Sequence, residues 1–102
     1  MTNNTQSLEL ANGEKVELTL TFAKLYQLRT LKPEEYEKFN NVVMNGTKDM
    51  FDFLRVNYTA YLCSHVDDLA ACMSFEDFMD KSTYDINMQA AVAQGFLSSK
   101  KK

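Results

Sequence analysis

The sequence predicts a mainly helical α+β fold, in which a small bundle of about five helices packs on an N-terminal β-hairpin. Apolar residues alternate with polar ones on both sides of Asn12-Gly13, which indicates a hairpin. Apolar residues then recur every three or four positions, and residues that cap or end helices separate these periodic stretches. A length of 102 residues suits a single domain, assigned to residues 1–102.

Two strands are expected at residues 7–11 and 14–21, joined by the Asn12-Gly13 turn. The polar residues 1–6 in front of them are expected to fray. A two-stranded hairpin alone is marginally stable in water, so its leucine face should lie on the helices, or its strands should pair with another chain.

The helical body is expected over residues 22–97 and begins with two short helices. Thr21 can cap a helix that runs to about Leu31. Pro33 fixes φ and disfavours helical geometry at the residue before it, so it should end this helix and begin the next. Gly46 is the expected end of the second helix.

The segment Phe51–Cys63, with the sequence FDFLRVNYTAYLC, predicts a third helix that is apolar on more than one side. Thr47 is the expected cap, and the helix should run as far as Val66 or beyond. An apolar surface this wide indicates a central helix or one that lies partly under a partner.

Two further helices are expected near the end of the chain. Ser74 can cap a short helix that contains Phe75, Phe78 and Met79. A last amphipathic segment spans residues 86–97, although Gly95 weakens its helical propensity. Residues 98–102, which end in three lysines, are expected to form a disordered tail.

Charge and composition favour protein partners. The formal net charge is -3 even though Lys100, Lys101 and Lys102 contribute three positive charges, so the body is acidic. Such a surface lacks the basic patch that binds phosphates, which argues against nucleic acid and anionic membranes as partners. The sequence also has neither a signal-peptide pattern nor an apolar run of about 18 residues, so we expect a cytoplasmic protein.

Cys63, His65 and Cys72 form the one group with metal-binding or nucleophilic chemistry. Their spacing lacks the paired short intervals of structural zinc sites. Residues two apart on a helix point about 200° away from each other, so Cys63 and His65 cannot share a proton there. We therefore expect two buried free thiols, no metal, no cofactor and no catalytic residue.

Tyrosine and methionine are the residue types that suggest a binding surface. The five tyrosines should mostly lie at core edges with their hydroxyls toward water, although tyrosine is also favoured at interfaces. The interior methionines either fill the core or form a surface that can repack around varied partners. These are Met44, Met50, Met73, Met79 and Met88.

Four segments resemble the tail assembly chaperones of long-tailed phages and prophages of Gram-positive bacteria. They read TFAKLYQLR (21–29), YEKFNNVVMNG (36–46), FDFLRVNYTAYLC (51–63) and CMSFEDFM (72–79). The resemblance covers roughly residues 20–80, in the same order and with similar spacing, and rests on apolar positions that carry the fold.

This resemblance implies a non-catalytic protein that binds the long tape measure protein and keeps it soluble until tail tube subunits polymerise around it. Members of the family are absent from the mature virion and use no cofactor. Many are also made as a longer, frameshifted product whose extra domain recruits tail tube protein. The codons for Ser98 to Lys102 could hold such a frameshift site, or these residues could simply form a solvated tail.

The predicted function is therefore a tail assembly chaperone of the host cytoplasm. Its tape measure groove is expected to contain Tyr58, Tyr61, Phe75, Phe78 and Met79. A small acidic regulatory module that binds another protein, such as an antitoxin or anti-repressor, is the alternative. An enzyme that uses Cys63 or His65 is the second alternative, and self-association remains open.

Overall fold

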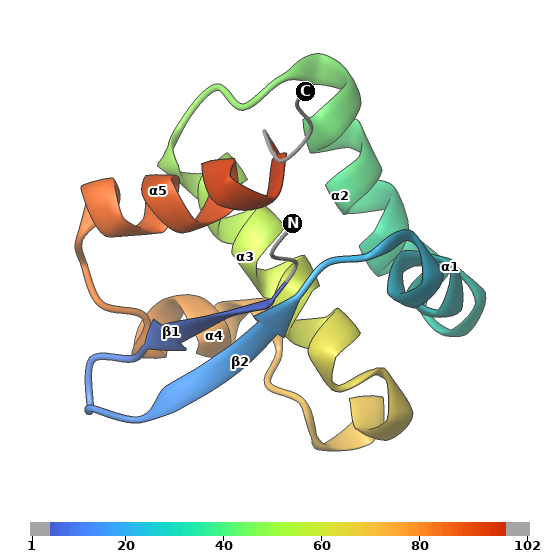
Figure 1. Cartoon of the computed structure of the whole chain (residues 1–102), viewed down its shortest axis with the longest axis horizontal. Coiled ribbons are helices and arrows are strands. Elements are labelled where there is room, and N and C mark those ends of the chain that lie inside the picture. Colours follow the sequence, from blue (N-terminus) through green and yellow to red (C-terminus); the bar gives the residue numbers. More distant parts are fainter. Residues whose placement is uncertain (1–4, 98–102) are drawn as a thin grey trace.

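Helix α3 (Met50–Ser64) lies at the centre of the fold, and the other elements pack around it (Figure 1). The computed structural model describes residues 5–97. An antiparallel hairpin, β1 (Thr5–Glu9) and β2 (Lys15–Thr19), comes first. The remaining elements are α1 (Phe22–Leu31), α2 (Pro33–Asn45), α3, a 3-10 segment (Val66–Ala71), α4 (Phe75–Lys81) and α5 (Ile86–Leu97). The predicted α+β bundle of about five helices on a hairpin is confirmed.

The burial of α3 explains its apolar sequence. Every residue from Val56 to Cys63 is buried, because β2, α5, α2, α1 and α4 all contact this helix. The wide apolar surface therefore belongs to a central helix, which was the first of the two alternatives. The N-terminal end of α3 differs, since Phe51 is 54% exposed there.

The hairpin has its leucine face against the helices, as expected. Leu8 and Leu18 are fully buried and belong to the same core cluster as α3. Gly13 adopts a φ of 92°, a left-handed conformation that suits glycine in the turn. The expected fraying of residues 1–6 is wrong for Thr5 and Gln6, which already pair with β2, while residues 1–4 lie outside the described part of the chain.

The linker after α4 adds a short third pairing to this hairpin. Leu10 forms an isolated bridge with Ser82, and the Ala11 amide donates to the Lys81 carbonyl at 2.8 Å. The Thr83 hydroxyl donates to the Glu9 carbonyl at 3.1 Å. These bonds fix the α4–α5 linker on the edge of β1.

The predicted boundaries of α1 and α2 are confirmed. The Thr21 hydroxyl accepts a hydrogen bond from the Lys24 amide at the start of α1. Lys32 leaves helical geometry with a φ of -140°, and Pro33 is the first residue of α2. Gly46 ends α2 with a φ of 84°, a conformation that suits glycine.

Both predicted ends of α3 need correction. The cap is Asp49 instead of Thr47, because the Asp49 carboxylate accepts hydrogen bonds from the Phe51 and Asp52 amides at 3.0 and 3.2 Å. The helix ends at Ser64 instead of Val66, and the chain continues as the 3-10 segment.

The last two helices match their predictions. The Ser74 hydroxyl accepts from the Asp77 amide and caps α4, and α5 covers residues 86–97 with Gly95 inside it. The predicted lysine tail at residues 98–102 lies outside the described residues. Within residues 5–97, no helix combines the length and the hydropathy that a membrane span requires.

Candidate functional site

Three of the five predicted partner-binding residues are buried. Tyr58 and Tyr61 are 4% and 6% exposed, and Phe78 of α4 is fully buried. The Phe78 ring centroid lies 5.4 Å from that of Tyr58 and 5.7 Å from that of Tyr61. These rings pack α4 against α3, so Tyr58, Tyr61 and Phe78 lie in the core and not at the surface of the expected groove.

The hydroxyls of both tyrosines bind one residue of the segment that leads into α4. Tyr58 donates to the Met73 carbonyl oxygen at 2.7 Å, and the Met73 amide donates to the Tyr61 oxygen at 3.0 Å. Burial is the main cause that raises the pKa of Tyr58 to about 12 and also raises the pKa of Tyr61. The hydroxyls of Tyr58 and Tyr61 therefore form hydrogen bonds with the backbone of Met73, whereas they were expected to point toward water.

Phe75, the fourth predicted residue, is half-buried and covered by an arginine. The Arg55 guanidinium carbon lies 3.8 Å from the Phe75 ring centroid, and Arg55 also donates to the Glu35 carboxylate at 2.9 Å. The Phe75 ring packs edge-on against Tyr58. Arg55 thus links α2, α3 and α4, and Phe75 belongs mainly to this structural contact.

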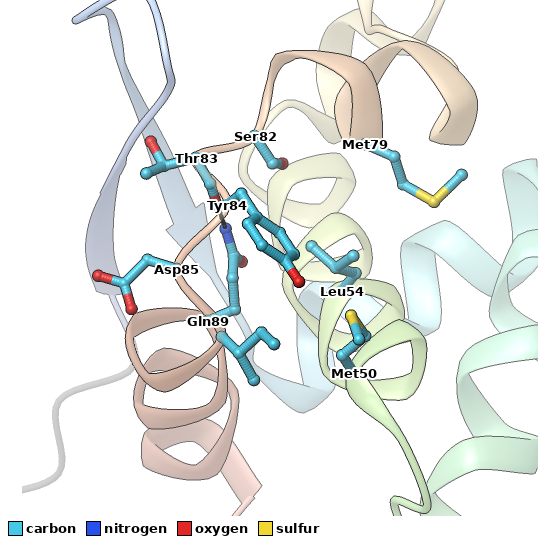
Figure 2. A pocket seen from close by; sticks show the side chains of 9 residues that line it. Met50, Leu54, Met79, Ser82, Thr83, Tyr84, Asp85 and Gln89 are labelled. Carbon is cyan, nitrogen blue, oxygen red and sulfur yellow. Dashed lines mark hydrogen bonds between the residues drawn. The ribbon is translucent and has the colours of Figure 1, made fainter.

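Met79, the fifth predicted residue, lines a concavity on the surface (Figure 2). Its volume is about 110 Å³, and its walls come from the N-terminal ends of α3 and α5, from α4 and from the α4–α5 linker. The lining residues are Met50, Leu54, Met79, Ser82, Thr83, Tyr84, Asp85, Ile86 and Gln89. This concavity is the candidate functional site.

Large apolar side chains dominate its open side. Tyr84 is 85% exposed and Ile86 is 41% exposed, although both are bulky and largely apolar. Figure 2 shows the Tyr84 ring between the linker and Leu54, with Met50 and Met79 on the α3 and α4 sides. An exposed apolar surface rimmed by polar residues is characteristic of a binding site.

A buried polar network supports the opposite wall. Gln89 is 4% exposed and its side-chain amide donates to the Thr83 carbonyl at 3.3 Å. The Asn57 amide donates to the Gln89 side-chain oxygen at 2.9 Å and to its carbonyl oxygen at 3.1 Å. These bonds connect the linker, α5 and the centre of α3.

Met79 is the one lining residue among the five predicted partner-binding residues, and Met50 is among the methionines expected either in the core or at an adaptable surface. The large apolar residues Leu54, Tyr84 and Ile86 were not predicted to line a site. Tyr84 carried a usable signal, because it is an aromatic residue between Thr83 and Asp85 in the short linker between two helices. The methionines divide between the two expected roles: Met50 and Met79 line the concavity, whereas Met73 and Met88 pack against the core.

A second group of exposed apolar residues lies on α1 and α2. Phe22 is 90% exposed, Tyr26 is 63% exposed and Met44 is 75% exposed. Arg29 lies 5.2 Å from the Tyr26 ring centroid and 5.9 Å from that of Tyr36. None of these residues lines the concavity.

The thiols and the histidine do not form a common site. Cys63 is buried, and burial raises the pKa of its thiol to about 12, so it stays protonated near neutral pH. Cys72 is half-buried instead of buried as expected, and His65 is exposed with its Nδ1 at 3.0 Å from the Tyr61 carbonyl oxygen. Residues 5–97 contain no group of three or more His, Cys, Asp or Glu side chains arranged to hold a metal ion.

Comparison of the chain with protein-family models, with curated proteins and with solved structures finds no match.

Proposed function

We propose that this protein is a non-catalytic tail assembly chaperone, which binds the tape measure protein in the cytoplasm of the host cell and keeps it soluble during tail morphogenesis. The four segments that resemble this family, at residues 21–29, 36–46, 51–63 and 72–79, supply the family assignment. The proposed binding site is the concavity between α3, α4 and α5, in place of the expected groove at the tyrosines of α3.

The observation that carries the proposal is the exposed apolar lining of this concavity. Tyr84 and Ile86 expose apolar surface, and Met50 and Met79 lie beside them. Thioether side chains are flexible and polarizable, so a lining that contains them can adapt to different apolar residues. A protein that handles many similar segments of one long partner needs this adaptability.

The small volume of the concavity favours a protein partner. Small-molecule sites typically enclose about 300–1,000 Å³. The concavity, at about 110 Å³, has room for roughly one large side chain. It therefore suits an anchor residue of a protein segment better than a substrate or a cofactor.

In this proposal the tape measure protein is the principal partner, and tail tube protein is recruited through a longer frameshifted product. Several copies of the chain would bind along one tape measure molecule. Neither nucleic acid nor membrane takes part, in keeping with the formal net charge of -3.

Co-purification tests this proposal and its alternative together. The tagged chain is co-expressed with the tape measure and tail tube proteins encoded nearby, and complexes are sized by light scattering. A complex that contains tape measure protein and several copies of the chain is the expected product. In a parallel culture the tagged chain is co-expressed with a basic toxin or repressor encoded nearby. A one-to-one complex in that culture, and no complex with tape measure protein in the first, would instead identify a regulatory module.

A further inference from the structure

The charged residues in the segments that form the concavity indicate the chemistry of its partner more closely than the apolar lining does. Residues 47–54 and 74–89, which contain all the lining residues, hold six acidic and two basic side chains. Within residues 5–97, none of these six carboxylates forms an ion pair, because the one ion pair there joins Arg55 to Glu35. The segments that form the apolar site are therefore acidic, and Asp85 is the charged residue in its lining.

Helix capping accounts for part of this negative charge. The Asp49 carboxylate accepts amide hydrogen bonds at the start of α3, and the Asp85 carboxylate accepts one from the Met88 amide at 3.1 Å. The positive ends of the helix dipoles offset some of the charge of these two residues. Glu76, Asp77 and Asp80 add further negative charge to these segments. A partner segment that contains lysine or arginine is therefore favoured.

The structure of the walls also restricts the conformation of the occupant. The lining comes from helix α4, from the N-terminal ends of α3 and α5, and from the α4–α5 linker, whose Ser82 already pairs with Leu10 of the hairpin. No β-strand residue contributes to the lining, so a peptide cannot bind there by extending the hairpin. Among the recurring modes of peptide recognition, the insertion of side chains from an amphipathic helix is the one that suits an apolar site walled by helices.

We propose that the concavity binds a basic amphipathic helix, which inserts one large apolar side chain between Met79, Tyr84 and Ile86 and has lysine or arginine one turn to either side. This inference deepens the proposed function by naming the chemistry of the tape measure segments that bind. The partner is recognised by charge and by one apolar anchor, so different segments that share this pattern bind the same site.

A fluorescent peptide tests the inference directly, because the chain contains no tryptophan. The probe is a synthetic amphipathic helix of about 18 residues, long enough to form a helix in water, with one central tryptophan and lysines one turn away. Its emission shifts to the blue when tryptophan enters an apolar site. A second peptide has glutamate in place of each lysine.

The matched variants alter exposed apolar residues on two different surfaces. The double variant Tyr84→Ser/Ile86→Ser removes two walls of the concavity, and Phe22→Ser removes a more exposed aromatic residue on α1. We expect the lysine peptide to bind the wild type and Phe22→Ser equally, and the double variant at least about tenfold more weakly. The glutamate peptide should bind the wild type at least about tenfold more weakly than the lysine peptide.

Three results would overturn the inference: no binding of the lysine peptide to the wild type, equal binding of the two peptides, or equal binding to the wild type and a folded double variant. Circular dichroism establishes whether the double variant is folded. If the double variant is unfolded, the binding of the lysine and glutamate peptides to the wild type decides whether the inference holds.

Co-expression with tape measure protein separates this inference from the proposed function. If the folded double variant solubilises tape measure protein as well as the wild type does, the function stands and the site is wrong. If the wild type itself does not solubilise it, the function is wrong, and the peptide comparison still decides the chemistry of the site.

Discussion

The Tyr58 hydroxyl donates a 2.7 Å hydrogen bond to the carbonyl oxygen of Met73, fifteen residues further along the chain. This bond crosses from the buried centre of α3 to the segment that leads into α4. The concavity includes Met79 of α4 and Leu54 of α3. The Tyr58–Met73 bond therefore helps to set the distance between two walls of the proposed binding site.

Replacing Tyr58 by phenylalanine tests the importance of that bond. The ring contacts with Phe75 and Phe78 can persist, but the Met73 carbonyl loses its donor, so we expect a loss of about 1–2 kcal/mol of stability. Urea unfolding followed by circular dichroism measures it. Tyr26→Phe is the control, since Tyr26 is 63% exposed and should change stability by less than about 0.5 kcal/mol. Equal effects of the two substitutions would contradict the assignment.

Arg55 should not tolerate lysine. A planar guanidinium stacks 3.8 Å from the centre of the Phe75 ring while it donates to Glu35, and an ammonium cannot reproduce both contacts. The two side chains of the ion pair are only 14% and 23% exposed, so we expect Arg55→Lys to cost about 1 kcal/mol. Arg29→Lys is the matched control, because exposed Arg29 lies over Tyr26 without a carboxylate partner among residues 5–97. A smaller loss for Arg55→Lys than for Arg29→Lys would refute this role.

Stability should decrease at alkaline pH because of Cys63. Burial raises the pKa of its thiol from 9.0 to about 12, so the unfolded chain loses this proton first. The contribution is fully present below about pH 9 and is lost between about pH 9 and pH 12, at roughly 1.4 kcal/mol per pH unit. Cys63→Ala should make stability less steeply dependent on pH in this window, as measured by urea unfolding at several pH values. An unchanged slope in the variant would contradict the assignment.

Gly95 and Gln6 should show strong coupling. A Cβ atom at Gly95 would lie 3.0 Å from the Gln6 side-chain nitrogen, which donates to the Val92 carbonyl at 3.2 Å. Gly95→Ala gains about 1 kcal/mol of helix propensity but displaces this amide, so we expect little net change in the wild type. In a Gln6→Ala background the same substitution should stabilise the protein by about 1 kcal/mol. Additive effects in a double-mutant cycle of thermal unfolding would count against this contact.

The fold was largely predictable because the signals at its element boundaries are local. Thr21, Pro33, Gly46 and Ser74 act through their own backbone geometry or through an amide three residues away. The cap of α3 was not predictable in the same way. Thr47 and Asp49 are both good capping residues, and the sequence alone did not distinguish them.

The candidate site was less predictable because segments distant in the sequence form it. Tyr58 and Tyr61 resemble interface residues until Met73 and α4 fold back over α3 and bury them. The concavity joins the start of α3 to residues 79–89, and no periodicity within one helix could indicate this contact. Met79 was the one predicted residue that lies in its lining.

The most direct test of the central claim is the soluble fraction of tape measure protein on co-expression. The tape measure protein encoded nearby is expressed alone, with this chain, and with an equally abundant unrelated acidic protein, and its soluble and pelleted amounts are quantified. We predict that tape measure protein moves into the soluble fraction only when this chain is present. Equal insolubility in all three cultures would contradict the proposed chaperone function.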